Sequence, residues 1–250
     1  MNGLLKVCIS VSLLGTFSLK TQAQDLGDYV KTIDRTVKSV KTKTGTSGGA
    51  LSQSEIAAGL REALEIGAKN ATGLVSKPNG FFGNALIKVL MPPEAKKVEN
   101  TLRQLGMGRY VDDAILSMNR AAEDASIKAL TIFVNAIKGM SIQDGLAILK
   151  GGNNAATNYL KNKTTAALTS SFKPVIRESL DKVNATKYWS IVFTTYNELP
   201  TTFKKINPDL PSYVTERALA GVFHYIEDEE AKIRLNPAAR VTDLLKKVFK

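Results

Sequence analysis

The chain has 250 residues, 44% of them hydrophobic, with one cysteine, one histidine and a formal net charge of +11. This length and apolar content can supply the core of one large domain or of two small ones. A single cysteine and a single histidine exclude disulfide bonds, histidine-based zinc sites and cysteine–histidine nucleophiles.

The first 23 residues have the order of a secretory signal peptide. A positive start with Lys6 precedes an apolar stretch over residues 7–19, and small residues lead to Ala23. The stretch is shorter than the ~18 residues of a membrane-spanning helix, which disfavours the alternative of a retained anchor. We expect cleavage after Ala23, loss of Cys8 with the signal, and a periplasmic or secreted mature chain without thiol chemistry.

The positive charge bears on the partners. It falls from +11 to +9 when Lys6 and Lys20 leave with the signal peptide. Such a balance suits phospholipid headgroups, acidic polymers or nucleic acid, and export excludes nucleic acid. We expect an envelope component or a weak contact with an anionic membrane surface, although the sequence points to no particular partner or oligomeric state. The alternative is that scattered lysines, none in a dense block, keep the protein in solution.

Residues 24–50 predict an amphipathic helix and a linker. In Asp25–Val40 apolar residues recur every three or four positions, and Lys31, Arg35 and Lys38 lie on the polar face. The modest apolar bulk of this helix predicts only weak membrane binding. Residues 41–49 are glycine, serine, threonine and lysine, which is typical of a flexible linker. We therefore expect the compact domain to cover residues 51–250.

The first half of this domain predicts helices separated by turns. Ser52 and Glu55 form a capping box that opens a helix, and a Pro-Asn-Gly turn at residues 78–80 ends it. Residues 81–90 are a short apolar run, either helical or extended, and a helix follows over residues 94–105. Residues 109–138 then predict the longest helix, with its apolar face toward the core.

The second half continues in the same way. Ser141 and Asp144 cap a short helix, another opens near Asn154, and Pro174 is expected in the first turn of the next. Further helices are expected around residues 188–199, over 214–234 and after Pro237. No stretch alternates with period two for long enough to form a sheet. The predicted fold class is therefore all-α, a single irregular multi-helix domain with a loosely tethered N-terminal helix.

Three motifs resemble those of a known family. They are residues 118–125 (MNRAAEDA), residues 156–160 (ATNYL), and residues 220–240, which run from AGVF through Glu229-Glu230 and Ile233-Arg234 to NPAAR. In this order and spacing, residues 51–249 resemble an exported bacterial family named domain of unknown function 4197. The resemblance implies an all-helical envelope protein of Gram-negative type, and it brings no established activity.

Most familiar catalytic templates are missing from the sequence. The lone histidine, His224, falls on the polar face of its predicted helix beside Arg217 and Asp228, so we interpret it as a solvated surface residue rather than a catalytic base. No Gly-x-Ser-x-Gly turn, phosphate-binding glycine loop or dinucleotide motif occurs. We predict no catalytic residue of a known type, no metal and no cofactor.

Two polar groups form the candidate site. Glu229 and Glu230 lie at the edges of an apolar helix face, and a partly buried carboxylate needs a partner. We predict that Glu230 pairs with Arg234 or Arg240 and ties the last two helices together.

The second group belongs to the central predicted helix. Asn119 and Glu123 lie one turn apart at the margin of its apolar stripe, so we predict a buried polar pair, with Arg120 beside them. One interpretation is a structural network that fixes the helix register. The other is a pocket where Asn119, Glu123 and Glu230 converge, which requires the two carboxylates within about 12 Å of each other for a hydrolase.

Three functions remain open. A non-enzymatic binding or scaffold module of the envelope fits best, because catalytic motifs are missing and the N-terminal helix could dock a partner. The alternatives are a carrier of an apolar or anionic small molecule such as a lipid, and a carboxylate-dependent hydrolase of an envelope polymer.

Overall fold

The computed structural model describes residues 51–198, 205, 209–236 and 242–248. The chain divides into two units, residues 1–50 and 51–250, and all of the described residues belong to the second. The expected signal peptide, its cleavage site, and the expected helix and linker over residues 24–50 lie outside the described residues.

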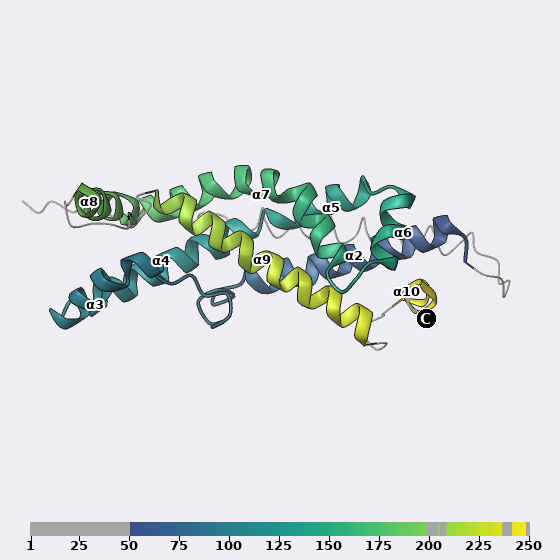
Figure 1. Ribbon diagram of the computed structural model, residues 1–250, viewed down its shortest axis with the longest axis horizontal. Helices are drawn as coiled ribbons and strands as arrows, with labels where there is room; N and C mark the ends of the chain where they lie inside the picture. The colour runs from purple at the N-terminus through teal and green to yellow at the C-terminus, as the bar shows by residue number, and fades with distance from the viewer. Residues whose placement is uncertain (1–50, 199–204, 206–208, 237–241, 249–250) are drawn as a thin grey trace, which may run out of the picture. The chain divides into compact units, whose positions relative to one another are not determined.

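The described part of the chain is built of helices and contains no strand, so the all-α prediction is confirmed (Figure 1). Its elements are α2 (Gln53–Val75), the short 3-10 helix η1 (Pro93–Ala95), α3 (Lys96–Gln104), α4 (Gly108–Ser126), α5 (Ala129–Lys138), α6 (Ile142–Lys150), α7 (Ala155–Asp181), α8 (Ala185–Glu198), α9 (Leu210–Leu235) and α10 (Asp243–Val248). Within these residues, no helix taken singly is long and apolar enough to cross a membrane. Residues 108–138 and 142–150 pass that test only as a pair, with a bend of 105° between them.

Both predicted capping boxes are present. The Ser52 hydroxyl accepts the N–H of Glu55 at 3.2 Å, and the Glu55 carboxylate accepts the N–H of Ser52 at 2.8 Å. Ser141 and Asp144 make the same two hydrogen bonds, each at 3.0 Å. These bonds satisfy N–H groups that a helix start leaves open, so α2 and α6 begin where the sequence predicts.

The helix predicted over residues 109–138 is divided in two. α4 ends at Ser126 and α5 begins at Ala129, and the Lys128 N–H bonds to the Ala125 carbonyl, three residues back. The Ser126 hydroxyl donates to the Ala122 carbonyl at 2.7 Å. Such side-chain bonds compete with the helical backbone ladder and bend helices. The apolar pattern continues across this break, so periodicity alone predicts one helix. That prediction is wrong.

Helix α7 passes through Pro174, where the sequence predicts the start of a new helix. The proline removes the N–H that would bond to the Ser170 carbonyl, which costs about 3 kcal/mol. Leu168, Phe172 and Ile176, on both sides of it, are 0% exposed. Burial of these side chains offsets the cost. The prediction of a helix boundary is therefore wrong at this position.

Helix α9 begins at a cap made by Asp209. Its carboxylate accepts the Ser212 N–H at 3.1 Å, the Ser212 hydroxyl at 2.6 Å and the Lys173 ammonium of α7 at 2.9 Å. Partial burial raises the pKa of Asp209, but these donors outweigh burial and lower that pKa to about 2. The cap therefore also attaches the start of α9 to α7.

Helix α9 joins the other long helices. It packs against α7, α2 and α4, and Figure 1 shows it running diagonally across them. In the core, the rings of Phe133 from α5 and Phe223 from α9 meet edge to face, with 5.8 Å between their centroids. α3 packs mainly against α4, where the two form a helical hairpin. The stretch between α2 and η1 lies against α4 and α9.

Candidate functional site

Residues 76–92, between α2 and η1, form an irregular stretch that we call the clamped segment. It consists of turns and extended backbone, so residues 81–90 are not helical. Asn79 has a left-handed φ of 66°. A Cβ on Gly80 would lie 2.5 Å from the Leu74 carbonyl oxygen, so only glycine fits where the segment turns away from α2.

Asn119 on α4 holds the later part of the clamped segment. Its side-chain oxygen accepts the Val89 N–H and its side-chain nitrogen donates to the Val89 carbonyl, both at 2.8 Å. The same nitrogen also donates to the Ile115 carbonyl at 2.7 Å. Asn119 and Val89 are both 0% exposed. The carboxamide therefore satisfies a buried backbone unit that has no neighbouring strand to pair with.

Glu123, one turn further along α4, holds the earlier part. One carboxylate oxygen accepts the N–H groups of Phe81 and Phe82, each at 3.1 Å, and the other accepts the Arg120 guanidinium at 2.6 Å. Arg120 also donates to the Asn79 side chain at 2.9 Å. Glu123 is 3% exposed, and this buried charge is satisfied by two amides and one cation. Its role in the fold is to hold backbone.

Helix α9 holds the clamped segment from the other side. Phe81 is 0% exposed and packs directly on Gly221, where a Cβ would lie 2.4 Å from the phenyl ring. Asn84 donates to the Tyr225 hydroxyl at 2.6 Å. The segment is therefore fixed by side chains and packing from α4 and α9 together.

Residues 86–90 alternate between the inside and the outside of the domain. Ile87 and Val89 are 6% and 0% exposed, whereas Leu86 and Leu90 are 78% and 53% exposed. Lys88, between the two exposed leucines in the sequence, is half-buried and follows a turn over residues 85–87. We call Leu86, Lys88 and Leu90 the outer stripe.

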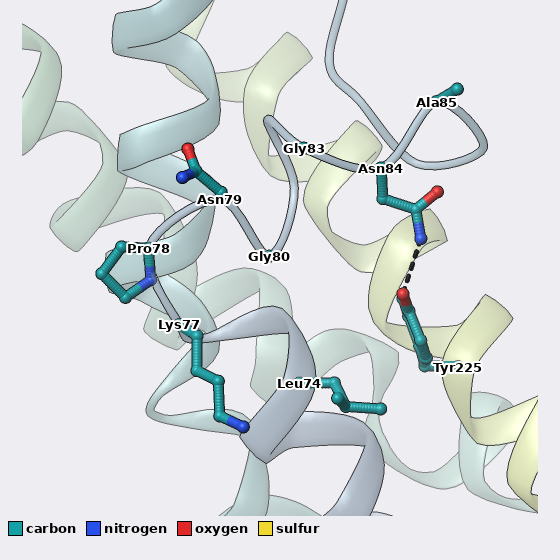
Figure 2. A pocket seen from close by; sticks show the side chains of 9 residues that line it. All are labelled: Leu74, Lys77, Pro78, Asn79, Gly80, Gly83, Asn84, Ala85 and Tyr225. Carbon is teal, nitrogen blue, oxygen red and sulfur yellow. Dashed lines mark hydrogen bonds between the residues drawn. The ribbon is translucent and has the colours of Figure 1, made fainter.

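A surface hollow of about 460 Å³ lies beside the beginning of the clamped segment (Figure 2). It is lined by Leu74, Lys77, Pro78, Asn79, Gly80, Gly83, Asn84, Ala85 and Tyr225. Figure 2 shows the hydrogen bond from Asn84 to Tyr225 joining the segment to α9 at this hollow. The polar groups of the lining are one ammonium, two carboxamides and one phenol, with no carboxylate among them. This lining suits an anion or a neutral polar group and holds no acid–base pair.

Glu230 on α9 caps the start of α7. Its carboxylate accepts the Ala156 N–H at 3.0 Å and both the N–H and the hydroxyl of Thr157 at 2.8 Å. Arg234, one turn later, contacts Glu230 at 2.9 Å, as the sequence predicts, and donates to the Ile148 carbonyl at 2.9 Å. The side chain of Asn154, the N-cap residue of α7, makes no capping hydrogen bond to this helix. Glu230 thus supplies from another helix the negative charge that a helix start favours.

Glu229 faces another neighbour. It accepts the Asn70 side chain of α2 at 2.8 Å and the Lys232 ammonium at 2.6 Å. Arg240 lies outside the described residues, so a link through it stays a prediction. The pair of Glu230 with Arg234 lies within α9 and connects this helix to α7, whereas the sequence predicts a tie between the last two helices.

The candidate residues fall into separate clusters. Asn119, Arg120 and Glu123 surround the clamped segment, Glu230 lies at the start of α7, and Glu229 faces α2. Asn119 and Glu123 do not pair as predicted, because each binds a different part of the segment backbone. A cavity of about 20 Å³ beside Glu230 does not include Glu123 in its lining. The carboxylates of Glu123 and Glu230 bind different backbone segments, and a role for either in ligand binding stays a prediction.

Other chemistry is limited in the described part of the chain. His224 lies 3.7 Å from Asp228 with a side chain 37% exposed, a half-exposed surface position on α9. Among the described residues, no three histidine, cysteine or acidic side chains lie close enough together to hold a metal ion.

A family model described as "Protein of unknown function (DUF4197)" matches residues 50–250. The chain belongs to this family. No curated protein and no solved structure matches it. In this DUF4197 domain the three motifs are linked, partly through the clamped segment. The first holds the clamped segment, the segment packs on Gly221 of the third, and Glu230 of the third caps the helix that carries the second.

Several residues that line the hollow of this DUF4197 domain could not be predicted from the sequence. Lys77, Asn84 and Tyr225 meet at the hollow although they come from two turns and a helix far along the chain. The only local signal was the Pro-Asn-Gly turn at residues 78–80. Nothing in the sequence indicates that Tyr225 faces this turn, because that contact depends on how α9 packs.

Proposed function

We propose that this DUF4197 protein is a non-enzymatic binding module of the bacterial envelope, with the outer stripe and the adjoining hollow as its binding surface. The main support is that Asn119 and Glu123 use buried polar side chains to fix an irregular surface segment. Buried polar groups are costly unless they are fully satisfied, so this arrangement favours one shape of the segment. A surface held in one shape loses less entropy on binding.

A carboxylate-dependent hydrolase has less support. Glu123 and Glu230 are 3% and 6% exposed, and their oxygens accept hydrogen bonds from backbone amides and an arginine. A general acid or base must reach the proton that it transfers, and these groups face the interior of the fold. Replacement of either by glutamine is expected to reduce stability. If either glutamine variant lost an activity on an envelope polymer while its stability stayed unchanged, the hydrolase would again be supported.

A carrier that encloses a small molecule also has less support. The cavity beside Glu230 measures about 20 Å³, which is room for one water molecule. Ligand pockets in proteins typically measure about 300–1,000 Å³. The larger hollow at the clamped segment lies at the surface, which suits contact with a partner more than enclosure of an apolar molecule.

Photocrosslinking in living bacteria tests the proposed surface. A photoreactive side chain at Leu86 is expected to give a discrete adduct with an envelope component. Val183, 54% exposed just after α7, is the matched control and is expected to give no such adduct. Equal labelling from both positions, or none from Leu86, would contradict a binding role for the outer stripe.

The envelope location has its own test. Fractionation is expected to place the protein outside the cytoplasm, with a mature N-terminus at Gln24 in intact-mass measurement. A chain that keeps Met1 and fractionates with cytoplasmic proteins would remove the envelope from the proposal.

A further inference from the structure

We propose that the ligand of this surface is a bilayer containing anionic phospholipid, which the outer stripe enters and the hollow contacts through its lysine. This inference rests on the proposed function and makes it more specific. Three features of the surface support it: exposed apolar side chains, neighbouring cations and the small size of the patch.

The apolar part is the pair of leucines on the outer stripe. Leu86 and Leu90 are 78% and 53% exposed, and Leu74 at the edge of the hollow is 40% exposed. Large apolar side chains exposed in this way are candidates for a site of interaction. Asn119 and Glu123 hold the backbone that carries the stripe, so the leucines can enter an apolar layer without reorganisation of the segment.

The cationic part consists of the two lysines of the same segment. Residues 76–92 include Lys77 and Lys88 and no aspartate or glutamate. The Lys88 ammonium lies 3.8 Å from the centre of the Phe82 ring, and Arg120 binds Asn79 at the edge of the hollow. Near an anionic leaflet each such cation contributes favourably to binding, and phosphate oxygens accept from an ammonium.

A second exposed apolar site lacks this charge pattern. At the tip between α3 and α4, Leu105 and Tyr110 are each 69% exposed. Asp112 and Asp113 follow at once, with side chains 64% and 65% exposed. Arg103 lies 2.8 Å from Asp112 and Arg109 lies 3.8 Å from Asp113, so the charges of this tip balance. The tip therefore lacks the excess of positive charge found in residues 76–92 and is a natural control for the outer stripe.

The size of the patch favours a bilayer over a protein partner. A stable protein interface uses about 20–30 residues on each side, whereas this patch consists of three leucines, two lysines and the lining of one hollow. Contact with a bilayer needs no matching surface, because each inserted side chain and each cation contributes separately. The binding is expected to be weak and reversible, of the order of the ~10⁴ M⁻¹ of a single myristoyl chain.

Sedimentation with vesicles tests the inference on the purified protein. Binding is expected to vesicles made of equal parts phosphatidylglycerol and phosphatidylcholine, to be much weaker with phosphatidylcholine alone, and to fall as salt is raised. Leu86→Asp is expected to lower binding at least tenfold, and Leu86→Ser, which adds no charge, by a smaller factor. Leu105→Asp at the control tip is expected to bind like the unmodified protein. Both leucines are exposed, so circular dichroism is expected to show intact helices in each variant.

The charges are tested in the same assay. Lys77→Glu and Lys88→Glu are each expected to lower binding to the anionic vesicles several-fold. Lys161→Glu, at an exposed position on α7, makes the same change in net charge and is expected to leave binding nearly unchanged. Equal losses from all three variants would show that only total charge matters and would overturn the proposed site.

Other outcomes would also overturn the inference. They are absence of vesicle binding, equal binding to both vesicle types, or a greater loss from Leu105→Asp than from Leu86→Asp. If vesicles do not bind while Leu86 crosslinks to an envelope protein, the bilayer is wrong and the proposed binding module stands. If Leu86 gives no adduct with either lipid or protein in cells, the proposed function itself fails.

Discussion

Removal of the Glu230 carboxylate tests the structural role of the best-buried ion pair among the described residues. Glu230 is 6% exposed, and its partner Arg234 has a side chain 14% exposed. In Glu230→Ala the N–H groups of Ala156 and Thr157 lose their acceptor, and Arg234 loses its carboxylate partner. Breaking a buried pair in this way costs about 3–5 kcal/mol.

Glu230→Gln separates the charge from the shape of the side chain. Each Glu230 oxygen accepts at least one N–H group, so the N–H₂ of a glutamine would face another donor at either position and leave it unsatisfied. We expect a loss of about 2 kcal/mol, less than for alanine. The matched control is Glu227→Gln, because Glu227 accepts a hydrogen bond from Asn154 at the exposed edge of the same helix start. Its free energy of unfolding is expected to change by no more than about 0.5 kcal/mol.

Urea denaturation followed by circular dichroism measures these differences. For a domain of this size, the alanine variant is expected to lower the melting temperature by roughly 10 °C, since 1 kcal/mol corresponds to about 2–4 °C. A loss below about 1 kcal/mol for Glu230→Ala would refute the reasoning. It would mean that water or another acceptor replaces the carboxylate, and Glu230 would again be available for chemistry.

Three further predictions concern packing and pH. Gly221→Ala places a Cβ 2.4 Å from the ring of Phe81 and is expected to lower the free energy of unfolding by about 1–3 kcal/mol. The double variant with Phe81→Leu is expected to recover most of this loss. Additive losses from the two substitutions in urea denaturation would disprove the contact. Gly73→Ala on α2 meets nothing within 4 Å and is expected to stabilise the domain by about 0.5–1 kcal/mol, whereas a loss would contradict that open space. The pKa of Asp209 is lowered from 3.8 to about 2, so its contribution is present above pH 3.8 and is lost as the pH falls toward 2. Because its side chain is 39% exposed, we expect only about 1 kcal/mol from this group, and Asp209→Asn is expected to remove that part of the acid dependence of the free energy of unfolding.

Much of the secondary structure could be predicted from local patterns. The capping boxes at Ser52 and Ser141 and the apolar periodicity of α9 involve residues that are three or four positions apart. Such neighbours meet on the surface of one helix whatever the rest of the chain does. The break at residues 127–128 and the passage of α7 through Pro174 were mispredicted because packing decides them.

The sequence by itself also identified four of the buried polar residues, although it did not identify others such as Glu99. Positions on the helical wheel put Asn119, Glu123, Glu229 and Glu230 at the edges of apolar faces, and all four are buried. A buried carboxylate or amide requires partners, so the existence of polar networks followed as well. The sequence also placed Arg234 one turn from Glu230, because that pair lies within one helix.

Only the tertiary structure decided what these residues bind. Asn119 meets Val89 across 30 residues of chain, and Glu230 meets Thr157 across 73. The helical wheel gives the direction of a side chain about its own helix axis but not the neighbour that packs there. The packing of α4 and α9 therefore made Glu123 and Glu230 anchors for different backbone segments, and it left the outer stripe of the clamped segment as the surface to test.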